Sequence, residues 1–587
     1  MTQSPEDRSA ASSTTAASQL ESERRALLEA QRGGLRARLV TYTRLSGPGW
    51  LQSALTLGGG SLGSSLYLGV LAGYGMLWVQ PLAMILGIVM LSAIGYVVLS
   101  TQQRPFRAIN RHVNPVLGWG WALASLVASM VWCMPQYSLL TGVMQQNLFP
   151  GLLGADSAMG DFYGKLAIVA VVLVTTTGVT WAYDSGSRGI RLYELLLKLV
   201  VGMIVICFAG VVIQIARSSD GLPWGEILYG FVPDVSRIFR PSPAFERLVM
   251  AVPESVQGFW TARIVGEQRD VLISAAATAV GINMTFLLPY SMLARGWDKS
   301  FRGLARFDLS TGMLIPYLLA TSFVIIAATA RFQPAPMSGA GAVDAAVLAK
   351  LDDKQIDAIM RARLKYRLGD ESFAALSEPE VSQQLEPLSP DELALAAQMV
   401  RKDAFDLARS LQPLTGRFFA NIIFGVGVLG MTLSTITLLM LICGFVVCEM
   451  IGIPSKGWPH RIGTLAATVG ALGPFVWKGA SFYLVVPTSV FGMILLPVAY
   501  WTFFLLMNQR SLLGREMPTG GRRLAWNTLM ILAAGTATIA ALWSVWDKAR
   551  LRGLAALAGF LLLVLVAHWL RGKSAALPST SGEGAAD

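Results

Sequence analysis

Three consecutive glycines followed by hydroxyl side chains interrupt the first long apolar segment of this chain. Gly58, Gly59 and Gly60 precede Ser61, and Ser64 follows about one turn later. Each glycine costs a helix about 1 kcal/mol relative to alanine, so the triplet favours unwinding. Unwound main chain inside an apolar segment leaves carbonyl and amide groups that could bind an ion or a small polar solute. Close helix packing through small residues is an equally good interpretation of this segment alone.

A second interruption occurs in the segment GINMTFLLPYSML, which contains Gly281, Thr285 and Pro289. Proline removes one helical hydrogen bond and clashes with the carbonyl four residues earlier, which here belongs to Thr285. A break near Thr285 is therefore predicted, and a simple proline kink is the alternative. The two interrupted segments are the first and sixth apolar spans, and a spacing of five spans is typical of an inverted five-helix repeat. This spacing favours a transport protein over close packing alone.

Long uncharged stretches define the elements that must position these groups. Of the 587 residues, 53% are hydrophobic and only 14% are charged, and no Asp, Glu, Lys or Arg lies between Arg44 and Arg104. A helix needs about 20 apolar residues to cross the hydrocarbon core of a bilayer. Apolar spans are accordingly expected at 46–71, 76–100, 117–149, 165–183, 195–216, 271–294, 309–330, 418–449, 462–477, 480–507, 524–546 and 553–570. The sequence therefore predicts an all-α membrane protein with 11–12 transmembrane helices.

The distribution of basic residues predicts the orientation of these spans. The positive-inside rule places Arg- and Lys-rich linkers in the cytoplasm, and such linkers occur at 101–114, 184–192, 295–308, 450–461 and 508–523. The N-terminal segment 1–45 is also Arg-rich and contains no apolar run, which argues against a cleaved signal peptide. We therefore expect a multi-pass plasma-membrane protein of the bacterial inner-membrane type with a cytoplasmic N-terminus. The exception to the pattern is a basic cluster formed by Lys548, Arg550 and Arg552.

Two linkers on the opposite side are long, at 217–270 and 331–417. The second alternates charged and apolar residues at helical spacing, so we expect an extracytoplasmic helical insertion between the transmembrane blocks 46–330 and 418–570. This insertion is a candidate surface for a protein partner, but a solvated insertion is the simpler interpretation. Residues 571–587 are expected to form a disordered C-terminal tail.

The same composition argues against other classes of protein. The net charge of +11 resides in short clusters between apolar spans, so the expected partners are membrane lipid and a transported solute, not nucleic acid. The sequence contains no nucleophile elbow, phosphate-binding loop or metal-spaced His/Glu cluster, so neither an enzyme nor a bound cofactor is expected. Interfacial salt bridges or caps are the expected roles of four acidic residues near span ends, Asp184, Glu194, Glu254 and Glu449.

Several motifs resemble the natural resistance-associated macrophage protein (Nramp) family of metal transporters, which have the LeuT-type fold. The stretch GPGWLQSALTLGGGSLGSSLYLGVLAGYGMLWV is similar, without a gap, to the first helix of that family and its following turn. The eighth span resembles the family pattern through Gly430, Ser434 and Thr435, and the tenth resembles it through a Leu-Pro motif. The resemblance covers most of 46–546 apart from the two long outer linkers. It implies a 5+5 inverted repeat with broken first and sixth helices.

The residues that would bind metal in this family are replaced here. The family's Asp-Pro-Gly-Asn motif falls on Gly58–Ser61, its sixth-helix methionine falls on Thr285, and its following Pro-His is also absent. The tenth-helix glutamine position corresponds to Ser489. A bare divalent cation needs compensating negative charge or retained water, so tight coordination is hard to build from these residues. The remaining candidate metal ligands are the hydroxyls of Ser61 and Thr285.

The resulting hypothesis is a secondary transporter that works by alternating access. Its nominal cargo, implied by the resemblance, is a divalent metal cation of the Mn, Fe or Mg class. A carrier of a small organic solute such as an amino acid is one alternative, because half-helix amides can hold a carboxylate. A non-transporting membrane receptor that kept the fold is another. The predicted substrate site consists of Gly58, Gly59, Gly60, Ser61, Ser64, Gly281, Thr285, Pro289 and Ser489.

Overall fold

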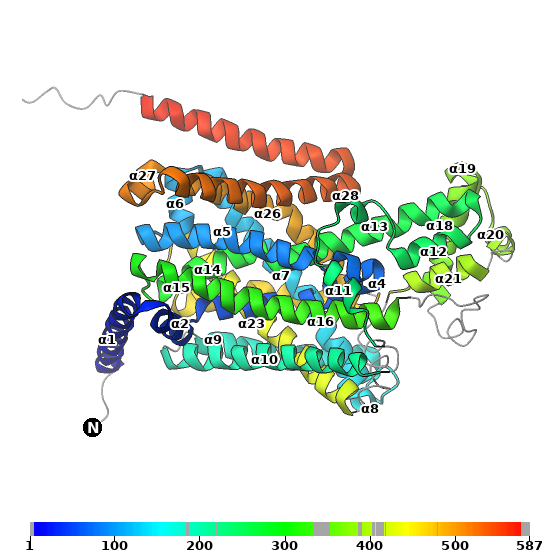
Figure 1. The fold of residues 1–587 in the computed structure, drawn as a ribbon, viewed down its shortest axis with the longest axis horizontal. Helices are drawn as coiled ribbons and strands as arrows, with labels where there is room; N and C mark the ends of the chain where they lie inside the picture. Colours follow the sequence, from blue (N-terminus) through cyan, green and yellow to red (C-terminus); the bar gives the residue numbers. More distant parts are fainter. Residues whose placement is uncertain are drawn as a thin grey trace, which may run out of the picture.

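The chain forms a bundle of long helices that run in roughly the same direction (Figure 1). The computed structural model describes all residues except 1–4, 184–186, 219–220, 334–352, 386–389, most of 402–417, 478 and 577–587. Most of the predicted tail therefore lies outside the described residues. In the part that is described, eight helices are long and apolar enough to cross a membrane, or nine if one bent pair counts as a single span. Every element there is a helix, which confirms the predicted all-α class.

The long helices account for most of the predicted spans. Outside the first and sixth spans, the long helices are α5 (Val79–Thr101), α7 (Pro115–Val143), α9 (Gly160–Tyr183), α10 (Ser187–Ala216), α16 (Ile315–Phe332), α23 (Phe424–Ile451), α26 (Val485–Met507) and α28 (Gly520–Ala576). α28 contains both of the last two predicted spans, separated by a kink at Arg550. The predicted span 462–477 is instead divided among α24 (Gly457–Thr464), the 3₁₀ helix η7 (Leu465–Leu472) and α25 (Gly473–Val476). This segment packs closely on α7, since a Cβ at Gly470 would lie 2.2 Å from the Cβ of Cys133.

The first span is broken, as its glycines predict. α3 (Pro48–Thr56) is followed by α4 (Gly59–Ala72), and the pair is bent by 49° at the break. Gly58 lies between them in an extended conformation, with ψ 179°. The main chain therefore leaves its helical hydrogen-bond pattern halfway across the span.

The sixth span is also broken, but the predicted position of the break was wrong. α13 (Glu254–Ala279) and α14 (Ile282–Ala294) are separated by Val280 and Gly281, both extended, and Pro289 lies inside α14. A proline removes only one helical hydrogen bond, which a helix can tolerate as a kink. At Gly281, by contrast, a Cβ would lie 3.2 Å from the Trp132 ring of α7. The close approach of α7 therefore favours glycine at this position.

The connecting segments gather at two opposite ends of the bundle (Figure 1). The N-terminal end holds α1 (Pro5–Arg32), α2 (Gly34–Leu45), α6 (Pro105–His112), α15 (Arg302–Leu309) and α27 (Arg510–Leu513). The insertion end holds α12 (Pro243–Ala251), α18 (Asp353–Leu368), α19 (Asp370–Ala374), α20 (Glu378–Leu385) and α21 (Pro390–Met399). Three of the basic linkers, 101–114, 295–308 and 508–523, thus share one end. α13 begins at Glu254, so the linker before it is shorter than the predicted 217–270.

The basic cluster that conflicted with the predicted orientation is partly neutralised. Lys548 Nζ lies 2.6 Å from Asp270 Oδ2 and 2.9 Å from Asp547 Oδ2. Two carboxylates around one ammonium group offset its positive charge locally. The cluster therefore weighs less against the predicted orientation than its count of basic residues suggests.

The insertion contacts two of the membrane-spanning segments. Tyr366 of α18 packs against Phe259 of α13 with ring centroids 5.5 Å apart. The Arg401 guanidinium, beyond α21, lies 3.7 Å from the centre of the Tyr483 ring, which precedes α26. The insertion thus touches the outer parts of the sixth and tenth spans. Binding of a protein partner at 331–417 stays a prediction.

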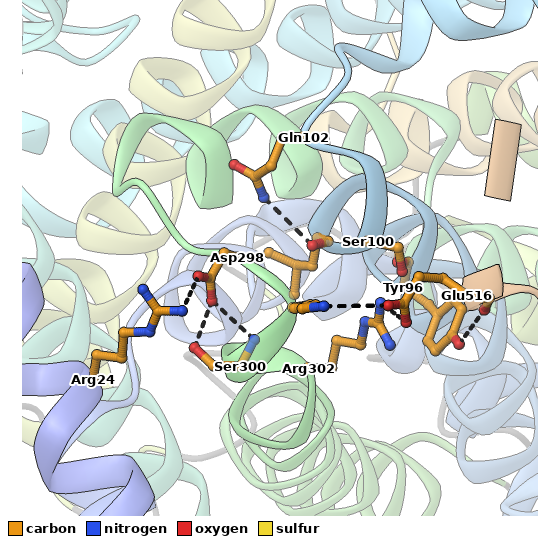
Figure 2. A network of polar contacts seen from close by, with 10 residues as sticks. Arg24, Tyr96, Ser100, Gln102, Asp298, Ser300, Arg302 and Glu516 are labelled. Atoms are coloured by element: carbon orange, nitrogen blue, oxygen red, sulfur yellow. Dashed lines mark hydrogen bonds and ion pairs between the residues drawn. The ribbon is translucent and has the colours of Figure 1, made fainter. Parts of the chain in front are cut away.

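A polar network links several elements at the N-terminal end (Figure 2). Arg302 donates a hydrogen bond to a Glu516 carboxylate oxygen at 2.8 Å, and Tyr96 donates its hydroxyl to the Glu516 carbonyl at 2.6 Å. The Arg302 guanidinium also lies 4.4 Å from the centre of the Tyr96 ring. Beside this group, Arg24 of α1 pairs with Asp298 at 3.2 Å. The network therefore joins α1, α5, α15 and the segment before α28.

Acid is expected to loosen this network at Glu516. Hydrogen bonding and charge from Arg302, with a further contribution from Lys299, hold the pKa of the Glu516 carboxyl below its ordinary value of 4.5. Because this pKa is lower in the folded than in the unfolded chain, the stabilisation is present at neutral pH and is lost as the pH falls below that ordinary value. Hydrogen exchange around Tyr96 and Glu516, corrected for intrinsic rates, should therefore accelerate in acid. Glu516→Gln should abolish this pH response, and an unchanged response in that variant would assign it to another group.

Candidate functional site

The two helix breaks lie against each other inside the bundle. Thr56, at the end of α3, donates its hydroxyl to the Ala279 carbonyl at the end of α13, at 3.4 Å. Ser61 of α4 donates its hydroxyl to the Thr56 carbonyl, and the same hydroxyl lies 3.5 Å from the Thr278 carbonyl. Carbonyl groups from both breaks therefore converge on one small region that also contains hydroxyl groups. Such a set of oxygens can hold a cation.

Neighbouring helices approach Gly58 and Gly59 closely, which favours glycine at both positions in addition to the break. A Cβ at Gly58 would lie 2.0 Å from Thr435 Oγ1 of α23, and a Cβ at Gly59 would lie 2.4 Å from Leu139 Cδ1 of α7. Gly60 is different, because the nearest atom to a Cβ there is the Thr278 methyl group at 3.5 Å. Close packing thus explains the glycines at positions 58 and 59, whereas Gly60 is explained only by its contribution to unwinding the helix.

Ser64 begins a buried polar column that runs from the break toward the insertion end. Its hydroxyl lies 2.7 Å from that of Ser274 on α13. Next to it, Gln80 of α5 donates to the Ser65 hydroxyl at 3.2 Å, and Tyr317 of α16 donates to the Gln80 side chain. All five side chains are buried. The column offers hydroxyl and amide groups to a solute, but no charge.

The Thr285 hydroxyl is occupied by other protein groups. It accepts a hydrogen bond from Trp121 Nε1 of α7 at 2.9 Å and donates to the Ile282 carbonyl of its own helix. Trp121 also stacks on Phe286, with ring centroids 4.5 Å apart. Thr285 therefore has to give up existing hydrogen bonds before it can bind a cation, and its role as a metal ligand stays a prediction.

Met284, which the sequence analysis did not select, has its sulfur at the meeting point of the two breaks. Met284 Sδ lies 3.5 Å from Thr56 Oγ1 and accepts from the Gly281 amide at 3.3 Å. The Met284 carbonyl accepts from Gln52 Nε2 of α3 at 3.3 Å, which ties the two spans together. The resemblance to the family placed its methionine one residue later, on Thr285. A shift of one residue in that correspondence would have identified Met284.

Ser489 and Pro289 lie away from the junction of the breaks. Ser489 is buried on α26, and the described residues show no hydrogen bond between its side chain and either break. The connection is indirect, because Trp132 of α7 donates to the Thr488 carbonyl at 3.0 Å and also covers Gly281. Pro289 is two turns into α14. The structure thus brings together Gly58–Ser61 and Gly281, with Ser64 one turn beyond.

Several polar atoms beside the breaks are buried without a hydrogen-bond partner among the described residues. They are Gln52 Oε1 and Ser53 Oγ on α3 and Asn283 Nδ2 on α14. Buried polar groups in native proteins nearly always have a hydrogen-bond partner, so these atoms can bind water or a polar solute. The breaks therefore surround a region with free hydrogen-bonding capacity.

The described residues place no acidic side chain among the groups that meet at this junction. Among the described residues, no group of three or more His, Cys, Asp or Glu side chains could hold a metal ion. Glu449 is fully buried at the end of α23, where it pairs with Arg104 at 2.7 Å, as expected for a salt bridge near a span end. Glu254 is exposed at the start of α13. The side chains of Asp184 and Glu194 lie outside the described residues.

A helical bundle whose first and sixth spans are broken at one buried polar junction is the architecture of a secondary transporter with an inverted repeat. The sequence establishes which family of such transporters this is. It matches the family described as natural resistance-associated macrophage protein-like (Nramp) over residues 49–351 and 393–547, and the chain belongs to that family. No curated protein matches the chain in sequence.

Solved structures show the same fold. A manganese transporter from Eremococcus coleocola, in complex with an aromatic bis-isothiourea substituted compound, is 13% identical with a TM-score of 0.56. A histidine-to-alanine mutant of a manganese transporter from the same organism is 15% identical with a TM-score of 0.52. Each similarity covers 90% of this chain and 94% of the other. At these identities the likeness establishes the fold and leaves the cargo to be argued from the site.

Proposed function

We propose that the cargo of this secondary transporter is a divalent transition-metal cation of the Mn²⁺ or Fe²⁺ class. The observation that carries the proposal is the position of the Met284 thioether at the junction of the two breaks, where it lies between the Thr56 hydroxyl and the Gly281 amide. A soft thioether favours transition metals, whereas an all-oxygen set suits Mg²⁺ and Ca²⁺. The solved Eremococcus coleocola structures are of manganese transporters, which supports the same class of cargo.

The neutral site implies weak binding of a partly hydrated ion. A divalent cation in a low dielectric needs compensating negative charge, and the junction offers only carbonyl, hydroxyl, amide and thioether groups. Water molecules retained on the ion can use the unpartnered Gln52 Oε1 and Ser53 Oγ as acceptors. Weak binding is compatible with transport, because the ion has to be released on the other side.

The amino-acid alternative is less well supported. Half-helix amides could hold a carboxylate, but several are already engaged by the protein. The Gly59 amide donates to Gln136 Oε1 at 3.2 Å, and the Met284 amide donates to Asn283 Oδ1 at 2.9 Å. A carboxylate would have to displace these groups, so the helix ends at the junction do not form an open anion site.

The location and orientation are part of the proposal. We propose that the N-terminal end faces the cytoplasm and the insertion end faces the opposite side of the plasma membrane. The gathering of basic linkers at one end supports this orientation. Impermeant labelling of a cysteine at Leu20 and of one at Tyr366, in sealed vesicles of known orientation, distinguishes the two ends.

Met284→Leu is expected to reduce transport of soft and transition-metal ions selectively. A ligand that contributes about 1.4 kcal/mol to binding accounts for about a tenfold difference in affinity. The KM for Mn²⁺ and Cd²⁺ uptake into proteoliposomes should therefore increase about tenfold in this variant. Mg²⁺ uptake, if present, should change little. Met292→Leu is the matched control, because Met292 is fully buried on the same helix and packs beside Gly95 away from the junction. Equal effects of both substitutions would contradict the assignment of Met284.

The cargo class itself is tested by a panel of substrates on the reconstituted full chain. Saturable Mn²⁺ or Fe²⁺ flux supports the proposal. Absence of Mn²⁺ and Fe²⁺ flux would overturn it, whether or not Mg²⁺ or Ca²⁺ is transported. Thermal stabilisation by amino acids but not by metals would favour the organic-solute alternative.

A further inference from the structure

An apolar cavity of about 390 Å³ opens between α5, α13, α26 and α28, beside the sixth helix break. Its wall on α13 is a single stripe at helical spacing, formed by Arg269, Leu272, Ile273, Ala276 and Val280. The other walls are almost entirely apolar, and short side chains such as Ala537 on α28 leave the space open. The volume lies within the range of small-molecule sites, roughly 300–1,000 Å³.

The cavity faces the bilayer. Several of its lining side chains are large, apolar and well exposed, among them Phe239, Ile539 and Trp543. In a membrane-spanning chain, such a surface meets lipid hydrocarbon. Side chains that line an apolar cavity gain dispersion contacts when a hydrocarbon chain fills it, so lipid acyl chains that reach the cavity are expected to enter it.

The depth of the cavity matches one leaflet. Arg269 precedes Val280 by eleven residues, which is roughly 16 Å along a helix with 1.5 Å rise per residue. Half of a hydrocarbon core is about 15 Å thick. Because Val280 lies at the break in the middle of the sixth span, Arg269 lies near the headgroups of the leaflet at the insertion end. The stripe therefore extends from headgroup level to the bilayer midplane.

Arg269 provides a cation at the mouth of the cavity. Its Nε donates to the Ile238 carbonyl at 2.9 Å, and its guanidinium lies 4.7 Å from the centre of the Trp543 ring and 5.5 Å from that of Phe239. These contacts hold the side chain in place. In the described part of the chain no carboxylate lies within ion-pair distance of it, and the Asp547 carboxylate interacts with its charge only from farther away. A guanidinium held in this way is well suited to bind a phosphate group.

We propose that this cavity binds one phospholipid from the leaflet at the insertion end, with its phosphate on Arg269 and one acyl chain along α13 as far as Val280. The cation at headgroup level, the apolar stripe below it and the length of one leaflet all match this occupant. The end of the acyl chain contacts Val280, which belongs to the sixth break. The lipid thus braces the outer half of the sixth span against α5 and α28, whichever solute the junction carries.

Photolabelling of the full chain in liposomes tests this proposal. The probe is phosphatidylglycerol with a diazirine at the middle of one acyl chain, and labelled peptides are identified by mass spectrometry. We expect labelling concentrated in 272–280 of α13 and 533–540 of α28. Ala276→Phe, which fills the cavity at mid-depth, should reduce labelling of these peptides about tenfold, and Arg269→Gln should reduce it severalfold.

Two control substitutions separate the site from bulk lipid. Ile531→Phe changes an exposed lipid-facing position of α28 that does not line the cavity, and Arg263→Gln removes another arginine of α13 that does not line it. Both should leave the labelling unchanged. Thermal melting and size-exclusion profiles check that each variant folds, and Arg269→Gln decides the result if Ala276→Phe does not fold.

Three outcomes would overturn the proposal. Labelling spread evenly over lipid-facing helices and insensitive to Ala276→Phe would mean boundary lipid only. Cavity labelling insensitive to Arg269→Gln would contradict the placement of the phosphate. Absence of photolabelling in 272–280 at every probe concentration, together with the mass of a dimer in size exclusion, would mean that a second copy of this chain covers the cavity.

Discussion

Replacing Asp308 with alanine is expected to release the first half of the broken first span and to open the N-terminal end of the molecule. Asp308 lies in α15 and is almost completely buried. Its Oδ2 accepts from the Gly49 amide at 2.6 Å and from the Gly47 amide at 3.2 Å, at the start of α3. A carboxylate at a helix N-terminus also interacts favourably with the helix dipole. One side chain from the seventh span thus binds the N-terminal end of α3.

The expected size of this effect follows from the hydrogen bonds that are lost. Hydrogen bonds to charged groups contribute roughly 1.5–3 kcal/mol each, so alanine should destabilise the position of α3 against α15 by about 3 kcal/mol. About 1.4 kcal/mol corresponds to a factor of ten, so the ratio of molecules with α3 detached to molecules with α3 in place should rise about a hundredfold. α3 is the part that moves, because it is short and is separated from α4 by the break at Gly58.

Cysteine labelling measures this opening. Ser53 is fully buried on α3, so Ser53→Cys should react slowly with an impermeant maleimide added from the N-terminal end. Asp308→Ala should accelerate the reaction strongly, and Asp308→Asn, which keeps an acceptor oxygen, should have a smaller effect. Asp298→Asn is the matched control at the same end, since Asp298 pairs with Arg24 and does not contact α3. Unchanged labelling in folded Asp308→Ala would show that other contacts hold α3.

Replacing Glu392 with alanine is expected to destabilise the packing of the insertion on α13. Arg363 of α18 donates to both carboxylate oxygens of Glu392 on α21, at 2.7 and 2.9 Å, and both side chains are buried. Trp260 of α13 donates to the same carboxylate at 3.3 Å. Alanine would leave a buried guanidinium without its counter-charge, which costs roughly 3–5 kcal/mol.

Two measurements report on this packing. One is the rate at which a protease cleaves the insertion, and the other is the rate of amide hydrogen exchange in α18 and α21. Arg361→Ala is the matched control, because Arg361 lies two residues away and forms exposed ion pairs with Asp357 and Glu378. Exposed pairs contribute about 0–1 kcal/mol, so this variant should behave almost like the parent. The double variant Arg363→Met/Glu392→Leu should recover most of the protection, since an apolar pair of similar volume replaces the ion pair. Equal exposure in Glu392→Ala and Arg361→Ala would contradict this account.

The residues of the site were only partly predictable. Ser61 and the first break followed from local composition, because three glycines weaken a helix wherever they occur. Met284 and Gln52 were not found, because their importance depends on which side of a helix faces the other break. Asp308 had no local signal either, since the amides that it binds are more than 250 residues away in the chain.

By itself, the sequence determined the all-helical membrane class, most of the spans and the existence of two interrupted helices. These features depend on the thickness of the bilayer and on hydrogen bonds between near neighbours, which hydropathy and glycine content report directly. The tertiary structure decided where the sixth helix breaks, which glycines are sterically required and which polar atoms share the junction. Those outcomes depend on the close approach of α7 and α23, whose contacts with the breaks are distant in sequence and leave no local pattern.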